Sequence, residues 1–132
     1  MIVQLLYTSR ATAAMTDVEW RRIEEISSVH NALNSITGLL VFDDRRIMQL
    51  LEGRDDRIDL LFGRIEHDRR NCEVVLRYRQ SVAFASYGEW AMRLCRMPDD
   101  GMDANETLER LMAPSLSPQL RNLMLSWGGK AS

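Results

Sequence analysis

Two segments with helical periodicity interrupt a series of short apolar runs along most of this chain. The apolar runs cover residues 2–9, 37–43, 46–52, 73–83 and 88–95, and each is typical of a β-strand. Asp43-Asp44-Arg45 separates the second run from the third, which indicates a hairpin. The order β-α-β-β-α-β-β predicts an α+β fold, a ferredoxin-like sandwich. Its five-stranded mixed sheet would carry two helices on one face.

Each helical segment has its own start signal. Thr16-Asp17-Val18-Glu19 forms a capping box, which predicts a helix from about Asp17 to Asn31. Asp55 or Asp56 is expected to cap the second helix. Its apolar positions recur at helical spacing: Ile58, Leu61, Phe62 and Ile65.

The end of the chain differs in character from the rest. Pro98-Asp99-Asp100-Gly101 is a break, so we divide the chain into a first unit, residues 1–97, and a C-terminal helical extension, residues 98–132. A short helix is expected near 104–112, and Ser117-Pro118 begins another that ends at Gly128. One stripe of that helix is apolar: Leu120, Leu123, Met124 and Trp127. We expect this stripe to cover the second face of the sheet, in preference to binding a partner.

Charge and cysteine content exclude several classes of protein. The formal net charge is −2 and the isoelectric point is near 5.7, which points neither to nucleic acid nor to an anionic membrane surface. No apolar run has the length of a membrane span, and the N-terminus resembles a strand rather than a signal peptide. Cys72 and Cys95 show neither metal-ligand spacing nor a disulfide framework. A cytoplasmic location is therefore expected.

Gln49 does not fit a plain apolar core. Strand alternation places it on the same face as Ile47 and Leu51, and these neighbours indicate that the face is buried. A buried amide without partners costs about 1–3 kcal/mol. Gln49 therefore needs hydrogen bonds from other side chains or from a ligand.

Two further polar side chains are expected near Gln49. Tyr7 shares a face of the first strand with Val3 and Leu5, and Asn31 continues a helical stripe from Ile23. A phenol and two amides facing an apolar chamber, walled by Ile23 and Ile65 between the two helices, would suit a planar heterocycle. Simpler interpretations stay open at this point. Tyr7 could be a core residue, Gln49 could bond to backbone, and Asn31 could be a helix C-cap.

Five motifs in order resemble the BLUF family, the flavin-binding sensors of blue light. The motifs are Tyr7-Thr8-Ser9, His30-Asn31 with Ile36-Thr37-Gly38, Gln49-Leu50-Leu51-Glu52-Gly53, Asp68-Arg69-Arg70 and Trp90-Ala91-Met92. The resemblance spans about residues 2–95. It implies non-covalent binding of FAD, with FMN as an alternative, between the two helices. The cofactor-binding residues that it implies are Tyr7, Ile23, His30, Asn31, Gln49, Ile65, Asp68 and Arg70. Arg10 is expected to lie on the surface.

The resemblance also implies a mechanism and a way of signalling. Light would move an electron and a proton from Tyr7, leaving Gln49 rotated or tautomerised with a new hydrogen bond to the flavin. Trp90 and Met92 on the last strand would relay this change to the C-terminal helices. No enzymatic turnover and no metal are expected. A chain of this length would act through a homo-oligomer, a dimer or larger, or through a separate downstream protein.

Two other functions were weighed against the photoreceptor. One is an interaction module of the same fold that has lost the flavin; the presence of Tyr7, Asn31 and Gln49 together disfavours it. The other is an acylphosphatase-like enzyme using Arg10 and Asn31. The absence of a Gly-rich phosphate loop after the first strand disfavours that enzyme.

Overall fold

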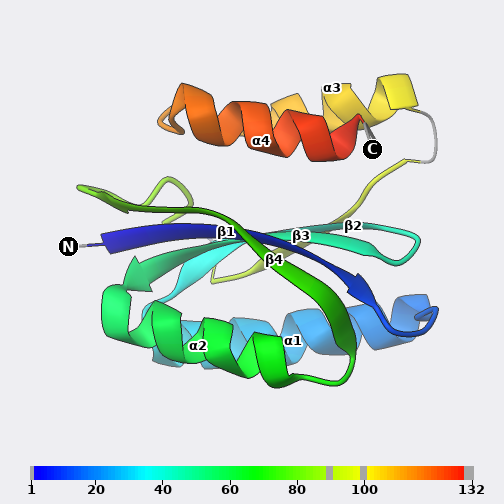
Figure 1. The fold of residues 1–132 in the computed structure, drawn as a ribbon, viewed down its shortest axis with the longest axis horizontal. Helices are drawn as coiled ribbons and strands as arrows, with labels where there is room; N and C mark the ends of the chain where they lie inside the picture. The colour runs from blue at the N-terminus through cyan, green and yellow to red at the C-terminus, as the bar shows by residue number, and fades with distance from the viewer. Residues whose placement is uncertain (1, 89–90, 99–100, 130–132) are drawn as a thin grey trace.

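The computed structural model describes residues 2–88, 91–98 and 101–129. Nine helices and strands follow one another in these residues (Figure 1). The elements are β1 (Ile2–Ala11), α1 (Asp17–Leu33), β2 (Thr37–Asp43), β3 (Arg46–Arg54), α2 (Asp55–His67), β4 (Asn71–Val82), β5 (Arg93–Arg96), α3 (Gly101–Leu111) and α4 (Pro118–Gly128). The predicted α+β order is confirmed.

The five strands form one mixed sheet in the order β4-β1-β3-β2-β5. β1 lies between β3 and β4 and is antiparallel to both, and β2 is antiparallel to β3. β5 runs parallel to β2 at one edge. This arrangement places Tyr7 of β1 directly opposite Gln49 of β3.

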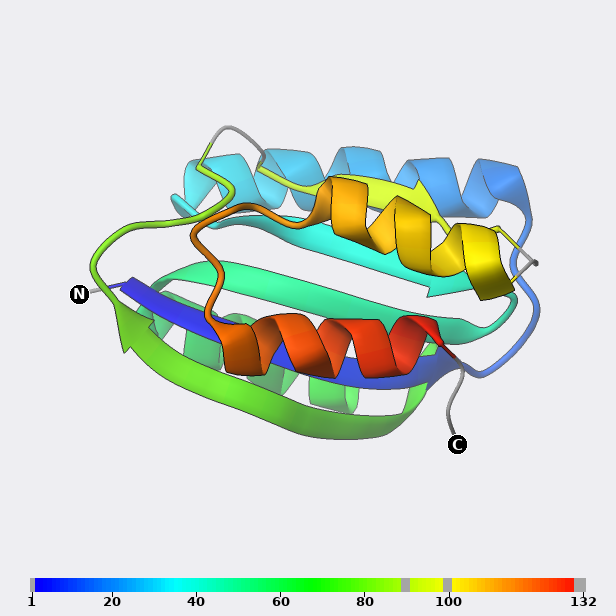
Figure 2. The same cartoon turned by 90° about the horizontal axis from the view of Figure 1, so that it is seen from above.

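Helices cover both faces of the sheet. α1 and α2 lie against one face, and α3 and α4 lie against the other (Figures 1 and 2). Each face has its own apolar core: one includes Leu5, Leu51 and Ile58, and the other includes Leu50 and Leu120. The three inner strands, β1, β2 and β3, therefore show almost continuous burial, whereas the edge strands β4 and β5 are largely exposed or partly buried.

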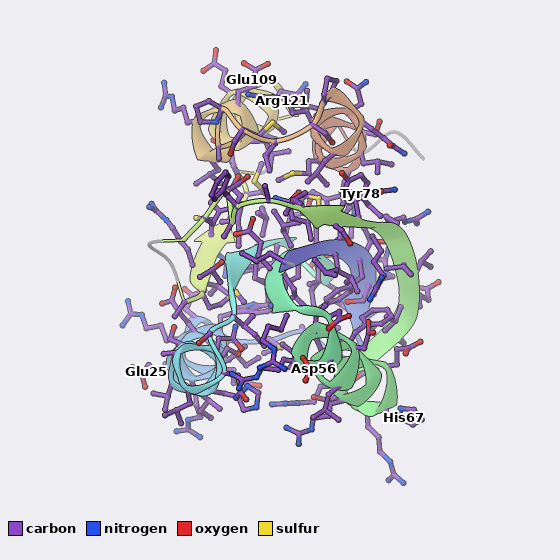
Figure 3. The ribbon with its side chains drawn as sticks, turned by 90° about the vertical axis from the view of Figure 1, so that its left-hand side faces the viewer. Glu25, Asp56, His67, Tyr78, Glu109 and Arg121 are labelled. Atoms are coloured by element: carbon purple, nitrogen blue, oxygen red, sulfur yellow. The ribbon has the colours of Figure 1, made fainter. Side chains whose placement is uncertain are left out.

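The C-terminal helices form the second cover that the sequence predicted. Leu120 and Met124 are fully buried, while Leu123 and Trp127 are partly buried against the same core. Tyr78 of β4 faces this helical layer (Figure 3), and its hydroxyl is 3.1 Å from the Ser117 hydroxyl. The apolar stripe of α4 is thus used mainly inside the molecule.

Local signals account for the helix starts. Thr16 and Glu19 make the capping box at the start of α1, and Ser117 caps α4 with Pro118 in its first turn. The predicted cap of α2 is wrong. The N-cap is Arg54, which makes no side-chain cap bond, and Asp55 and Asp56 lie inside the first turn.

The last strand is shorter than predicted. β5 begins at Arg93, not at residue 88, and residues 86–88 form a turn. The backbone N–H groups of Ser86 and Tyr87 donate to the buried carboxylate of Glu52, at 2.7 and 2.9 Å, and therefore do not join the sheet. Met92 precedes the strand, and Trp90 falls outside the described residues.

Two glycines lie where neighbouring atoms leave no room for a side chain. A Cβ on Gly38 would lie 2.0 Å from the carbonyl oxygen of Leu50 in the neighbouring strand. A Cβ on Gly128 would lie 2.1 Å from Leu108 Cδ1, so Gly128 permits α4 to pack closely on α3.

Among the described residues, no helix has both the length and the apolar character needed to cross a membrane.

Candidate functional site

A cavity of about 200 Å³ lies on the sheet face that α1 and α2 cover. Seven of the residues predicted to bind a cofactor line it: Tyr7, Ile23, Asn31, Gln49, Ile65, Asp68 and Arg70. They come from β1, β3, α1, α2 and the segment after α2. The fold thus brings together residues that lie far apart in the sequence.

Tyr7 and Gln49 form a hydrogen-bonded pair at the floor of the cavity. The Tyr7 hydroxyl donates to Gln49 Oε1, and both side chains are buried. Their contact follows from the strand register, because directly opposed residues on neighbouring strands lie side by side. Within the described part of the chain, the Gln49 side chain bonds to other side chains and not to backbone.

The amide nitrogen of Gln49 has a poor partner. Among the described residues it donates only to Met92 Sδ, at 3.5 Å. A thioether is a weak acceptor, and an amide nitrogen carries two N–H groups. Gln49 therefore keeps hydrogen-bonding capacity at a wall of the cavity.

Asn31 is buried and is not the C-cap of α1. The C-cap is Asn34, while Asn31 Nδ2 donates to the carbonyl of Ala91 at 3.1 Å. This bond ties the end of α1 to the segment that leads into β5. The remaining N–H and the amide oxygen of Asn31 can serve a ligand at the cavity wall.

His30 lies beside the cavity and does not line it. Its Nε2 is 3.3 Å from an Arg64 guanidinium nitrogen, and this contact bridges α1 and α2. Because guanidinium only donates, His30 Nε2 is the acceptor in this contact. Arg64 itself lines the cavity.

Aliphatic and aromatic side chains form the remaining walls. Ile23 of α1 and Ile65 of α2 are partly buried against the core on this face. Phe62 packs on Tyr7 with ring centroids 5.6 Å apart. Phe62 thus supports Tyr7 from behind the lining, and the cavity combines apolar walls with a few polar groups, as small-molecule sites do.

Asp68 and Arg70 form an ion pair at the rim. Two guanidinium nitrogens of Arg70 donate to the Asp68 carboxylate, the shortest contact being 2.7 Å. The hydrogen bond from Arg70 lowers the pKa of the Asp68 carboxyl, so this group is ionised at neutral pH. Arg70 is largely exposed and can also reach an anion at the rim.

Burial has a strong effect on Tyr7. It raises the pKa of the Tyr7 hydroxyl well above its ordinary value, and the negative charge of Asp68 adds to the rise. The side chain is a neutral phenol at every physiological pH. Its hydroxyl therefore keeps the proton that it donates to Gln49 Oε1.

A second hollow, of about 290 Å³, adjoins the cavity. Met15, Ile23 and Arg70 line both spaces, and Arg22 lines the second. Together the two volumes fall within the range of small-molecule pockets, about 300–1,000 Å³. Two arginines, Arg22 and Arg70, and one carboxylate, Glu19, line the outer space among the described residues, so the net charge of its lining is positive.

Sequence reasoning did not assign a role to several lining residues. Arg64 and Asn71 lacked a signal, because their place follows from how α2 and β4 pack. Ser27 lies four residues from both Ile23 and Asn31, so helical spacing alone could have included it. No group of three or more potential metal ligands occurs in the described parts of the chain.

A family model described as "Sensors of blue-light using FAD", BLUF, matches residues 2–93. The chain is 30% identical over 92 residues to photoactivated adenylate cyclase subunit beta of Euglena longa, which covers 69% of this chain and 11% of the cyclase subunit. It is 31% identical over 78 residues to the blue light- and temperature-regulated antirepressor BluF of Escherichia coli K12, covering 57% of this chain and 19% of the antirepressor. The chain thus spans only a small part of these relatives.

Solved structures show the same fold. The dark-state structure of BlrB, a BLUF protein, has a TM-score of 0.75 at 27% identity, covering 96% of this chain and 93% of BlrB. Klebsiella pneumoniae BlrP1, solved with FMN and cyclic diGMP, has a TM-score of 0.84 at 24% identity, covering 98% of this chain and 35% of BlrP1. The family match extends over well more than half of the sequence. The chain belongs to the BLUF family of flavin-using blue-light sensors.

Proposed function

We propose that this chain is a blue-light photoreceptor that binds FAD non-covalently in the cavity between α1 and α2. The observation that carries the proposal is the buried Tyr7–Gln49 hydrogen bond at the cavity wall. Beside it, the Gln49 amide nitrogen has a thioether as its only acceptor within residues 2–88, 91–98 and 101–129. A flavin ring edge presents carbonyl oxygens and ring nitrogens that would complete this hydrogen bonding.

The residues of the cavity fit such a ring. Ile23 and Ile65 would contact its two faces, and the amides of Gln49 and Asn31 would bond its polar edge. His30 would pack beside it through its contact with Arg64. FMN would fill the same inner space as FAD, so the family description is the reason for naming FAD.

The positive outer hollow would take the phosphate-bearing part of the cofactor. Arg70 and Arg22 both line it. Guanidinium groups bind phosphate oxygens strongly because several N–H donors point the same way. Asp68 would hold Arg70 in position through their ion pair.

The bound flavin would supply absorption of blue light and an electron acceptor. Tyr7 would give up an electron, and its proton would leave through the hydroxyl that faces Gln49 Oε1. Return of both would leave the Gln49 amide rearranged, by rotation or by tautomerisation. No substrate is consumed in this sequence of steps.

The C-terminal layer is the proposed output. Met92 contacts Gln49 and precedes β5, and Met97, directly after β5, packs into the core under α3 and α4. β5 therefore begins near one core and ends in the other. A change at Met92 or Trp90 would pass along this strand to the helices, and from there to a second copy or a downstream protein.

Colour is the direct test of the proposal. The protein, purified or mixed with FAD, should be yellow, and blue light should shift its flavin absorption reversibly to longer wavelength. The released cofactor, separated by chromatography after heat denaturation, should be FAD; recovery of FMN alone would replace that part of the proposal. A colourless protein that does not take up FAD would refute the photoreceptor and favour a flavin-free interaction module.

A further inference from the structure

A groove lies on the sheet face opposite the flavin cavity. Its volume is about 440 Å³, and it lies between α4 and the β1–β4 side of the sheet. Nothing in the proposed photochemistry uses it. Three arginines, Arg10, Arg46 and Arg77, line this groove together with one carboxylate, Glu73.

The positive charge of the groove is only partly compensated. Arg10 pairs with Glu73 at 3.5 Å, and Arg46 pairs with Asp43 at 3.0 Å. Arg77 makes no ion pair within the described part of the chain, and its Nε donates to the Thr8 hydroxyl at 2.9 Å. The groove therefore keeps at least one guanidinium available to an anion.

A β-bulge directs Arg77 into the groove. Leu6 pairs with Tyr78 and Tyr7 pairs with Leu76, so Arg77 has no partner position in β1. Arg77 lines the groove while the next residue, Tyr78, packs toward the same face and contacts Ser117. Bulges characteristically re-aim a side chain next to a functional site.

A second irregularity of β4 lies at the other end of the groove. Thr8 pairs with Val75 and Arg10 pairs with Cys72, which leaves an extra residue in β4. Glu73, within this irregularity, has a φ of 53°, in the left-handed region that a side chain such as glutamate rarely adopts. Such conformations cluster at binding sites.

The groove is elongated and is lined by both charged and apolar side chains. Its floor consists of residues of two neighbouring strands, from Leu6 to Arg10 in β1 and from Glu73 to Arg77 in β4. Four strand steps at about 3.3 Å each give a length near 13 Å, enough for about four residues of extended chain. Leu123 and Trp127 of α4 supply an apolar wall between the charged ends.

Trp127 is fixed in this position. The Arg46 guanidinium lies 4.4 Å from the centre of the Trp127 ring and also donates to the Trp127 carbonyl oxygen. One side of the ring is therefore occupied by a cation. The wall is built by the β2–β3 hairpin and α4 together, so it is formed before any ligand arrives.

We propose that this groove binds an extended acidic segment of a partner protein, with an aliphatic residue between its carboxylates. Arg77 and Arg10 would bind the carboxylates, and Val75, Leu123 and Trp127 would contact the aliphatic residue. The elongated shape and the alternation of cationic and apolar surface favour a peptide over a compact anion. The site does not depend on the flavin, so its test stands apart from the photoreceptor proposal.

The test measures binding of a fluorescein-labelled peptide, DELED, to the full chain by fluorescence polarisation. DELED should bind and its neutral analogue NQLQN should not. The Arg77→Gln variant should bind about tenfold more weakly, as expected for loss of a charge-assisted hydrogen bond. Arg79→Gln is the matched control, since Arg79 lies on the same strand but pairs with Asp59 of α2 on the opposite face. It should bind as the wild type does.

A second variant is expected to raise the affinity for DELED. Glu73→Gln removes the one carboxylate among the described lining residues, so it should bind DELED more tightly, by about twofold to fivefold. Loss of binding through misfolding cannot produce this gain. Arg77→Lys should keep part of the affinity.

Other outcomes would overturn the proposal. The first is that the wild type does not bind DELED at about 1 mM peptide. The second is that Arg77→Gln and Arg79→Gln weaken DELED binding equally, and the third is that Glu73→Gln binds DELED more weakly than the wild type. Displacement of DELED by succinate or inorganic phosphate at the peptide's own concentration would instead assign the groove to small anions. Tighter binding of a single-stranded oligonucleotide would assign it to nucleic acid.

Discussion

The buried carboxylate of Glu52 accepts the backbone N–H of Tyr87 at 2.9 Å, and the Tyr87 hydroxyl donates to the carbonyl of Leu111 at 2.6 Å. Two side chains thus connect β3, which carries Gln49, with the end of α3. Glu52 also accepts from Gln4, Thr37 and Ser86, at 2.7–2.9 Å. The carboxylate is fully satisfied by donors from β1, β2 and the segment before β5.

Replacing this carboxylate should destabilise the protein. Glu52→Gln places an NH₂ group where the carboxylate accepts N–H bonds, so at least one buried donor loses its acceptor. We expect the free energy of unfolding to fall by about 1–3 kcal/mol, measured by urea denaturation. Glu66→Gln, at an exposed position of α2, should change it by no more than about 0.5 kcal/mol. A Glu52→Gln protein of wild-type stability would contradict the structural role of Glu52.

Gln49 should be required for the spectral shift and not for flavin binding. Gln49→Leu keeps the volume of the side chain but removes its hydrogen bonds to Tyr7 and Met92. We expect a yellow protein that shows no red shift under blue light, measured by absorption spectroscopy. Gln80→Leu, at an exposed position of β4, serves as the control and should shift normally. A normal shift in Gln49→Leu would remove Gln49 from the switch.

Met92 should separate the optical change from the structural output. Met92→Ala removes the thioether beside Gln49 while Tyr7 and Gln49 stay in place. We expect the red shift to remain and the light-dependent hydrogen exchange of α3 and α4 to diminish. The same result is expected for Trp90→Ala. Val29→Ala, at an exposed position of α1, should leave both signals intact. Unchanged exchange differences in Met92→Ala and Trp90→Ala would rule out this route.

The stability of the protein should depend on Tyr7 at alkaline pH. Burial raises the pKa of the Tyr7 hydroxyl in the folded state, whereas the unfolded chain titrates near pH 10. The folded state therefore favours the neutral phenol. Its contribution is fully present below about pH 10 and is lost as the pH rises above that value. The free energy of unfolding of Tyr7→Phe should fall less steeply than that of the wild type above about pH 10. Equal slopes in urea titrations would contradict this assignment.

The packing of α4 on α3 can be tested by adding a methyl group at Gly128, with Gly63 of α2 as the control position. Gly128→Ala would place a methyl group 2.1 Å from Leu108 Cδ1, inside a buried core. We expect a loss of about 1–3 kcal/mol in the free energy of unfolding. Gly63→Ala in α2 meets nothing within 4 Å and should be neutral or gain up to about 1 kcal/mol from helix propensity. Equal effects of the two changes, measured by urea denaturation, would contradict the close packing of α3 on α4.

The parts of the fold with local causes could be predicted from the sequence. The Thr16–Glu19 capping box, the Asp43–Arg45 turn and the Ser117 cap all act within a few residues. Alternation places Tyr7 and Gln49 each on the buried face of its own strand, and the family resemblance implies that the two side chains meet. The start of β5 could not be predicted from the sequence. It depends on Glu52, which is distant in sequence and accepts the N–H groups of residues 86 and 87.

The groove beside α4 shows a second limit of sequence reasoning. A bulge such as the one at Arg77 depends on the register between β1 and β4, and neither strand carries a local signal for it. Arg10, expected to be a surface residue, lies with Arg77 only because that register brings the two strands together. The contact of Arg64 with His30 likewise follows from the packing of α1 and α2.

The position of β5 in the chain sets an order of assembly. This strand pairs in parallel with β2, whose residues are synthesised long before it, and the segment between them includes α2 and β4. The described residues that line the flavin cavity all lie between Tyr7 and Asn71. During synthesis these residues can therefore come together before Ala91 and Met92, the partners of Asn31 and Gln49, and before α3 and α4. If the proposed flavin binds early, it would act as a template on which the rest of the chain closes, and cofactor supply would then affect the folding yield.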